Sequence, residues 1–451
     1  MKQALYLLLY FVLGSHINCV RSSDSTRNSN YKISFKNQTL SIDMNNVINS
    51  SFQIELFDSS LKNSKIYFYC ETPHICSCQH NPIEISDDRF YYGNISVTGL
   101  FLGKSKLCAK SIFENEVKWM SDGCQNIIVL KEFGIADQIF TISIAIVVTI
   151  IFISFGACLD IDSLKEILIK PVGPIIGFCC QFILMPTISY LIGYVLFWDD
   201  VNMWLGLFFS GVSPGGGASN MWTLILKGNV NLSIVMTTIS NLAAFAMMPL
   251  WIFTLGATIF NRGNLGVPYE RVAVFSVSLI IPLVIGILVK KFQPKLANIL
   301  IRLLKPITII ILVYIMTFAI ILNFYVFKLF TWKIILAGMG LPWFGYILSY
   351  LIALMLKQNK EDCLTISIET GLQNTGIAMF LLRFSLEQPE ADLTSVIPVA
   401  VSFMTLLPLL ILYSIQRFLC TSAMKEEDIS TNPNEEERIM SPPSIRNQSN
   451  L

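Results

Sequence analysis

One acidic residue lies deep inside an apolar run of the sequence. Glu369 stands about eight residues, or ~12 Å of helix, inside the run 362 to 384, and no other acidic residue lies so deep in any apolar run. A carboxylate at such a depth in a membrane costs at least ~2.5 kcal/mol unless it is compensated, so a functional role is the first interpretation. Gln373 follows four residues later, and helical spacing predicts that it shares the face of Glu369.

Further oxygen-bearing side chains occur in two other apolar runs. Ser233 and Thr237 are four residues apart, so their hydroxyls face the same way on a helix. Gln181 is the one strongly polar side chain in the run GFCCQFILMP. A carboxylate, hydroxyls and side-chain amides form an all-oxygen set, which hard cations prefer. The sequence therefore predicts a site for a hard cation.

Several other functions are disfavoured by composition. The histidines all precede the first apolar run after residue 135, and the cysteines within the runs are scattered, which disfavours transition-metal chemistry and a histidine proton relay. A net charge of +1 without a dense basic run away from the membrane flanks argues against a nucleic-acid partner. Hydrolase signatures such as HExxH are absent from the sequence, so we expect neither an enzyme nor an organic cofactor.

Two apolar runs are interrupted by helix-breaking residues. SPGGGASN occupies Ser213 to Asn220, and ETGLQNTG occupies Glu369 to Gly376. Every backbone amide needs a partner in lipid, so such breaks persist only where protein or a polar cavity surrounds them. Broken helices present free carbonyl and N–H groups to a bound ion or anion. The alternative for the first break alone is a kink that packs on a neighbouring helix through its small residues.

The elements that carry these residues are nine apolar runs of spanning length. With 53% hydrophobic and 14% charged residues, the chain has the composition of a polytopic membrane protein that needs a lipid bilayer. The runs cover residues 136–158, 173–197, 203–226, 231–255, 270–289, 306–323, 334–356, 362–384 and 393–415. Lysine and arginine gather on alternate connections, which predicts an extracellular N-terminus, a transporter domain over 136–418 and a cytoplasmic, disordered tail over 419–451.

The region before the first run has a different composition. Residues 1–19 are typical of a signal peptide, with a short signal anchor as the alternative. Alternating runs over residues 20–135 predict a small β-rich extracellular domain with glycosylation sequons at Asn37, Asn49 and Asn94. Its cysteines suggest disulfides, and the odd count leaves the pairing open. A zinc site is the alternative, with ligands from Cys70, Cys76, Cys78 and His74 or His80.

The apolar part of the chain resembles the bile acid:sodium symporter family. The resemblance covers residues 136 to 415 and lies in three segments, SPGGGASNMWTLILKGNVNLSIVMTTISNLAAFAMMPL, IETGLQNTG and ISFGACLDIDSLKEILIKPVGPIIGFCCQFILMP. It implies a nine-span α-helical fold of inverted repeats, in which a panel of helices moves against a core and two broken helices cross at the middle. The breaks in the third and eighth runs are five runs apart, which agrees with such repeats.

The resemblance also implies two sodium sites that share Glu369. By this likeness the first site consists of Ser219, Asn220, Ser233, Thr237 and Glu369. The second consists of Glu369, Gln373, Gln181 and the backbone of Thr370 and Leu372. The substrate head is expected at Asn374, Gly215 and Gly216.

The function expected from these features is sodium-coupled, electrogenic symport across the plasma membrane. Two sodium ions would accompany one organic anion that resembles a bile acid or a steroid conjugate. The alternative is a receptor or scaffold derived from a transporter, which acts through an extracellular partner of the N-terminal domain. A glycosylated domain of this size is unlike the short N-terminus of the bile-acid carriers, so the substrate itself stays open.

Overall fold

The computed structural model describes residues 31–56, 65–78, 82–84, 90–113, 116–120, 123–132, 134–158, 171–299, 302, 317 and 330–431. The expected signal peptide and most of the expected sixth span lie outside these residues. The chain forms two compact units and passes from one to the other between Val129 and Leu130. Each unit is described separately.

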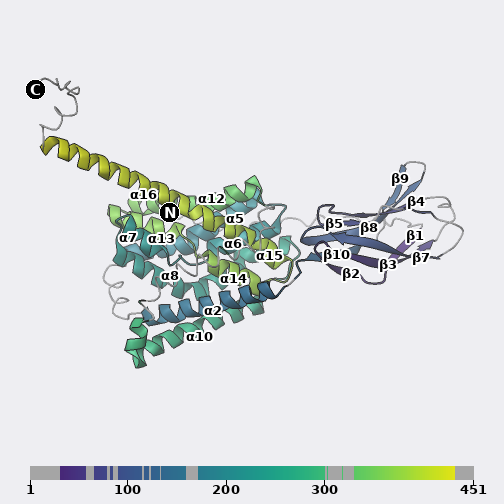
Figure 1. Ribbon diagram of the computed structural model, residues 1–451, viewed down its shortest axis with the longest axis horizontal. Coiled ribbons are helices and arrows are strands. Elements are labelled where there is room, and N and C mark those ends of the chain that lie inside the picture. Colours follow the sequence, from purple (N-terminus) through teal and green to yellow (C-terminus); the bar gives the residue numbers. More distant parts are fainter. Residues whose placement is uncertain are drawn as a thin grey trace, which may run out of the picture. The chain divides into compact units, whose positions relative to one another are not determined.

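The first unit is the β-rich domain that the sequence predicts (Figure 1). Its strands are β1 (Tyr31–Phe35), β2 (Thr39–Asp43), β3 (Val47–Leu56), β4 (Lys65–Cys70), β5 (Cys76–Cys78), β6 (Ile83–Glu84), β7 (Phe90–Gly99), β8 (Gly103–Phe113), β9 (Glu116–Met120) and β10 (Gln125–Leu130). They form a four-stranded sheet in the order β1-β3-β7-β5 and a six-stranded sheet in the order β2-β10-β8-β4-β6, with β9 paired to β8.

Strand alternation produces one hydrophobic core between these sheets. In β4, Ile66 and Phe68 are buried while Lys65 is exposed, which follows from the two-residue period of a strand. Disulfides join Cys70 to Cys76 and Cys108 to Cys124, whereas Cys78 is a buried free thiol. The zinc alternative is not supported, because two of its expected ligands form a disulfide. Burial raises the pKa of the Cys78 thiol and keeps it protonated.

The second unit is helical. Its helices are α2 (Ile135–Cys158), α4 (Val172–Cys179), the π-helical turn η2 (Cys180–Leu184), α5 (Met185–Leu196), α6 (Val201–Val212), α7 (Ser219–Ile225), α8 (Val230–Trp251), η3 (Ile252–Gly256), α9 (Ala257–Arg262), α10 (Tyr269–Phe292), α12 (Trp332–Met355), α13 (Lys360–Gly371), α14 (Thr375–Ser385), α15 (Glu390–Thr394) and α16 (Val396–Thr431).

Five helical segments of the described residues are long and apolar enough to cross a membrane. They are Val172–Leu196, Val230–Arg262, Tyr269–Phe292, Trp332–Met355 and Glu390–Phe418. Shorter apolar helices cover Val148–Ala157, Val201–Val212 and Thr375–Ser385. This is the architecture of a polytopic membrane protein, and the count of nine spans stays a prediction because most of the sixth lies outside the described residues.

Two further features of the helical unit are a closely packed helix pair and a long last helix. Helices α2 and α10 lie side by side (Figure 1) and touch backbone to backbone, since a Cβ on Gly286 would lie 2.0 Å from the carbonyl oxygen of Ile153. Helix α16 continues to Thr431 and so extends into the first part of the expected tail, whereas disorder of the remaining tail stays a prediction. The residues there, TSAMKEED, include the good helix formers Ala, Met, Lys and Glu.

Candidate cation site

The two predicted breaks meet each other. Helix α6 ends at Val212 and α7 begins at Ser219, while α13 ends at Gly371 and α14 begins at Thr375. The two interruptions pair as a short antiparallel bridge: Gly216 N donates to Leu372 O at 2.7 Å, and Asn374 N donates to Pro214 O at 2.8 Å. Each break therefore satisfies part of the other's backbone, as a membrane interior requires.

Glycine is needed where the breaks cross. A Cβ on Gly216 would lie 2.7 Å from a methyl of Leu372 and 3.2 Å from the carbonyl oxygens of Leu372 and Gln373. A Cβ on Gly371 would lie 2.3 Å from the ring of Tyr346. These close approaches explain why the helices are interrupted by small residues.

Glu369 of α13 is the centre of a first polar cluster. Its side chain is 2% exposed, and the Ser233 hydroxyl of α8 donates to its Oε1. Thr237 Oγ1, one turn later on α8, lies 3.0 Å from both carboxylate oxygens. Asn220 Oδ1 of α7 is 2.8 Å from Ser233 Oγ, and Ser219 Oγ is 3.5 Å from Thr237 Oγ1. All five residues of the first predicted site are thus brought together.

This first cluster holds more acceptors than donors. The hydroxyl protons of Ser219, Ser233 and Thr237 face the two carboxylate oxygens, Asn220 Oδ1, the Ser233 carbonyl and one another's hydroxyl oxygens, and each proton can serve one acceptor at a time. Within the described residues, no lysine, arginine or histidine forms an ion pair with Glu369. A buried carboxylate among surplus oxygens is complemented by a small hard cation.

A second polar cluster lies at the break itself. Gln181 Nε2, in the π-helical turn η2, donates to Gln373 Oε1 at 2.9 Å and to the Ser213 carbonyl at 2.8 Å. Gln373 Nε2 donates to the Thr370 carbonyl at 2.6 Å. Three members of the predicted second site, Gln181, Gln373 and the Thr370 carbonyl, are therefore brought together. The Leu372 carbonyl accepts from Gly216 N, whereas the Glu369 carboxylate accepts from Ser233 and Thr237.

One part of the sequence interpretation is wrong. Gln373 does not share a helix face with Glu369, because α13 ends at Gly371 and Gln373 lies in the break beyond it. Its side chain points back to Gln181 and Thr370, so the break sets its position.

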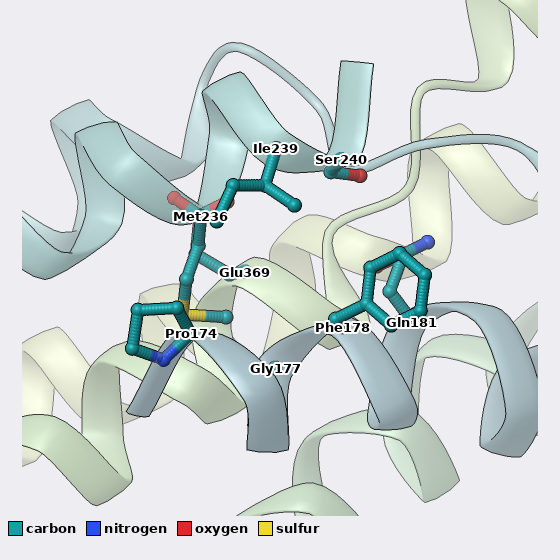
Figure 2. A pocket seen from close by; sticks show the side chains of 8 residues that line it. All are labelled: Pro174, Gly177, Phe178, Gln181, Met236, Ile239, Ser240 and Glu369. Carbon is teal, nitrogen blue, oxygen red and sulfur yellow. The ribbon is translucent and has the colours of Figure 1, made fainter. Parts of the chain in front are cut away.

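A small cavity of about 10 Å³, the space of roughly one water molecule, lies beside Glu369. Its walls come from α4, η2, α8 and α13, and are formed by Pro174, Gly177, Phe178, Gln181, Met236, Ile239, Ser240 and Glu369 (Figure 2). Because Glu369 and Gln181 both line it, this space adjoins both polar clusters. Gly177 admits the Met236 side chain, since a Cβ there would lie 2.0 Å from the Met236 methyl.

The chain is similar in sequence to known proteins of one family. The sequence profile of the sodium bile acid symporter family matches residues 145–329. The sodium-dependent organic anion transporter of Bos taurus is 32% identical over 260 residues, which are 57% of this chain and 67% of that protein. This chain belongs to the sodium bile acid symporter family. The hepatic sodium/bile acid cotransporter of Rattus norvegicus is 30% identical over 250 residues, 55% of this chain and 68% of that protein.

A further relative of this chain is the P3 protein of Mus musculus, which is 32% identical over 249 residues, 55% of this chain and 52% of that protein. The family and the first two relatives are named as transporters, which fits the expectation that the chain is not an enzyme. The profile match includes α7 and α8 but ends before Glu369 and Gln373, so for α13 the site is argued from the contacts above.

The three residues expected to contact the substrate head lie where the two helix breaks meet, and their polar groups already form hydrogen bonds within the protein. Asn374 is the N-cap residue of α14 and is half-buried, and its Oδ1 accepts from Ile377 N at 3.2 Å. The N–H of Gly215 donates to Ser240 Oγ at 2.9 Å, and that of Gly216 donates to Leu372. In this conformation both glycine N–H groups are therefore already engaged.

Sequence reasoning missed two polar residues of α8. Ser240 holds the first break through Gly215, and Asn241 Nδ2 donates to the Thr237 carbonyl at 2.8 Å. Their spacing was the available signal, because Ser240 and Asn241 lie three and four residues beyond Thr237 on the same helix.

Proposed function

We propose that this chain is a sodium-coupled symporter of an organic anion. The observation that carries the proposal is Glu369, a buried carboxylate within hydrogen-bond reach of Ser233 and Thr237 and without an ion pair among the described residues. A carboxylate in that position is stabilised when a cation occupies the surrounding oxygens. When transport of the anion requires that this cation be bound, the sodium gradient drives uptake of the anion, as in a symporter.

The proposed substrate is an amphipathic anion similar to a bile acid or a steroid conjugate. The names of the two transporter relatives support an organic anion, and the N-terminus of α14, capped by Asn374, supplies a positive dipole end for its head group. Phe155 lies 3.9 Å from the Cβ position of Gly217, so an aromatic ring of α2 borders the crossing. Arg383 of α14 pairs with Asp392 at 3.0 Å, so we do not assign it to the head group of the anion.

The test of symport is uptake by cells that express the full chain. Radiolabelled bile-salt conjugates and sulfated steroids are offered in sodium medium and in choline medium. We expect uptake of at least one anion in sodium alone. Equal uptake in both media would contradict sodium coupling, and a lack of uptake of every anion would favour the scaffold.

The proposed stoichiometry is two sodium ions per anion, one ion at each polar cluster. One net positive charge then moves inward with a monovalent anion, and at about 100 mV that charge contributes ~2.3 kcal/mol to accumulation. Voltage-clamped cells should show an inward current when a transported anion is added in sodium but not in choline. Uptake without current would mean that one cluster stays empty or that the anion is divalent.

The proposed topology places the β domain outside the cell at the plasma membrane and the C-terminus in the cytoplasm. Asn37, Asn49 and Asn94 are all exposed on the β domain, as glycosylation requires. Glycosidase treatment should increase the electrophoretic mobility of the protein. A shift that survives replacement of all three asparagines by Gln would show that the β domain is not the glycosylated region.

A further inference from the structure

Helix α8 carries a buried acceptor that has no hydrogen bond. Asn241 is 5% exposed, and its Nδ2 donates to the Thr237 carbonyl at 2.8 Å. Because a carbonyl can only accept, this bond fixes the side of the amide that carries the nitrogen and leaves Oδ1 on the other side. Among the described residues, Oδ1 has no partner. A buried oxygen in this state is rare and destabilising, so a donor from a bound molecule would stabilise it.

The side of α8 that carries Asn241 is the side that packs against α2. The preceding residue, Ser240, lines the cavity beside Glu369 (Figure 2), and Asn241 is turned about 100° further round the helix. Phe245 follows four residues later on the side of Asn241, and its ring centre lies 5.7 Å from that of Phe152 of α2. Asn241 therefore lies between the first polar cluster and the aromatic contact with α2.

The polarity of α8 changes at Asn241. Thr237, one turn before it, belongs to the first polar cluster, whereas Ala244 and Met248 beyond it belong to the hydrophobic core that also contains Phe152. Asn241 thus lies at the boundary between a cluster that contains a carboxyl group and an apolar environment. An amphipathic anion has a boundary of the same kind, between its head group and its apolar body.

The first break is open to the surroundings beside α2. Gly217 is exposed, and the nearest atom to its Cβ position belongs to Phe155 of α2, at 3.9 Å. The ring centres of Phe155 and Phe152 lie 6.1 Å apart, so the aromatic side of α2 continues from the break to the contact with Phe245. A ligand that reaches the crossing along α2 would therefore approach the side of α8 on which Asn241 lies.

We propose that Asn241 Oδ1 accepts a hydrogen bond from a hydroxyl group on the apolar body of the transported anion. An amide oxygen pairs with a hydroxyl but repels a ketone oxygen, so Asn241 selects hydroxylated anions. A site built to bond a hydroxyl rejects the analogue that lacks it, because its own acceptor then stays unpaired. Oδ1 is covered in this conformation, so the anion reaches it as α2 separates from α8. The inference rests on the proposed symport of an organic anion.

The test compares two steroid sulfates that differ in one group. Estradiol and estrone, each sulfated at the phenolic oxygen, carry a hydroxyl and a ketone at the same ring position. Binding to the purified full chain in sodium is measured as the rise in melting temperature with anion concentration. For the unaltered protein we expect a half-maximal concentration about fivefold lower for the estradiol sulfate, the ratio that one neutral hydrogen bond gives.

Asn241→Thr and Asn241→Val form a matched pair of variants. They have the same shape, but the threonine hydroxyl can donate to the Thr237 carbonyl and keeps lone pairs that accept. Asn241→Thr should retain the preference for estradiol sulfate, whereas Asn241→Val should lose it by binding that anion about fivefold more weakly. Thr238→Val is the control and should retain the preference, because that hydroxyl bonds to the Ile234 carbonyl on the exposed side of α8. The melting temperature without anion shows whether each variant is folded.

Four results would overturn the proposal. They are that neither anion raises the melting temperature of the unaltered protein, that it binds both equally, that Asn241→Val keeps the preference, or that half-maximal sodium rises in Asn241→Val but not in Asn241→Thr. The last result would assign the oxygen to a cation. Uptake of both anions in sodium and in choline separates the two proposals: selective binding without uptake contradicts the symport alone, and sodium-dependent uptake without a preference contradicts this proposal alone.

Discussion

The two polar clusters at the crossing differ in how their oxygens are engaged. Around Glu369, the hydroxyl protons of three side chains face a carboxylate, an amide oxygen and a backbone carbonyl, so acceptors are in surplus. Around Gln373, the amide nitrogens of Gln181 and Gln373 donate to the oxygens nearest to them, the Gln373 amide oxygen and the Ser213 and Thr370 carbonyls. The first cluster contains a carboxyl group, whereas the second contains only amide and carbonyl groups that are already hydrogen-bonded to each other.

This difference predicts the order in which the two proposed sodium ions bind. A cation can enter the first cluster by displacing hydroxyl protons from its oxygens, which needs only rotation of Ser233 and Thr237. At the second cluster the Gln181–Gln373 hydrogen bond must first give way, because its acceptor is the oxygen that an ion would use. We therefore expect the ion at the first cluster to bind with the higher affinity. Binding of the ion at the second cluster should require movement of the break between α13 and α14.

The largest effect is expected from Glu369→Gln. The substitution keeps the shape of the side chain but removes the charge on which the first cluster depends. Sodium-dependent uptake should fall to the level seen in choline, while the amount of protein at the cell surface stays normal. Near-normal uptake would show that sodium coupling does not depend on the charge of Glu369.

Gly216→Ala tests whether the crossing holds the two clusters together. Its Cβ would meet carbonyl oxygens of the other break at 3.2 Å, and overpacking of this kind destabilises by ~1–3 kcal/mol. Thermal stability and uptake should both fall. Gly217→Ala is the control, because the nearest atom to its Cβ would lie at 3.9 Å. Equal losses of stability and uptake in the two variants would contradict the importance of the close packing at Gly216.

Thr237→Val addresses the first cluster alone. Thr237 Oγ1 is one of the oxygens that would contact the ion, and an interaction of a hydroxyl with a charged group is worth ~1.5–3 kcal/mol, so the sodium concentration for half-maximal uptake should rise by about tenfold or more. Thr238→Val is the matched control, since that neighbouring hydroxyl is bonded to the Ile234 carbonyl on the exposed side of α8. A rise in Thr238→Val as large as in Thr237→Val would contradict the assignment.

Gln373→Ala addresses the second cluster and should have a smaller effect. The substitution removes Gln373 Oε1, the neutral oxygen that an ion would use, and loss of one such neutral contact at ~1 kcal/mol corresponds to roughly a fivefold rise in half-maximal sodium. The uptake curve should also become less cooperative in sodium. If Gln373→Ala and Ser233→Ala both leave half-maximal sodium unchanged, the two-site interpretation is wrong.

Local patterns in the sequence predicted much of the fold. Alternation identified β4 and part of β7, and the breaks at Pro214 and Gly371 were recognised from residue type. Strand β8 is harder to recognise, because its core-facing positions include Gly103 and Ser105 as well as Leu107 and Ala109. Alternation is a weak signal where the buried side chains are small or polar.

The first cluster was more predictable than the second for a physical reason. Ser233 and Thr237 share a continuous helix, so their spacing alone places them on one face. Gln373 lies outside any helix, and its position depends on Gly216 and Gln181, which are far away in the sequence. Contacts between distant breaks leave no periodic signal, so the sequence named Gln373 as a candidate but did not predict its geometry.

The central claim is that sodium binds at Glu369, and the thermal stability of the purified full chain tests it without a substrate. A ligand that binds only the folded protein raises its stability by RT ln(1 + [L]/Kd), which is ~2.7 kcal/mol at a hundred times Kd. We predict a higher melting temperature in sodium chloride than in potassium chloride at equal ionic strength, and no such difference in Glu369→Gln. Equal melting temperatures of the unaltered protein in the two salts, at sodium concentrations that saturate uptake, would contradict the account.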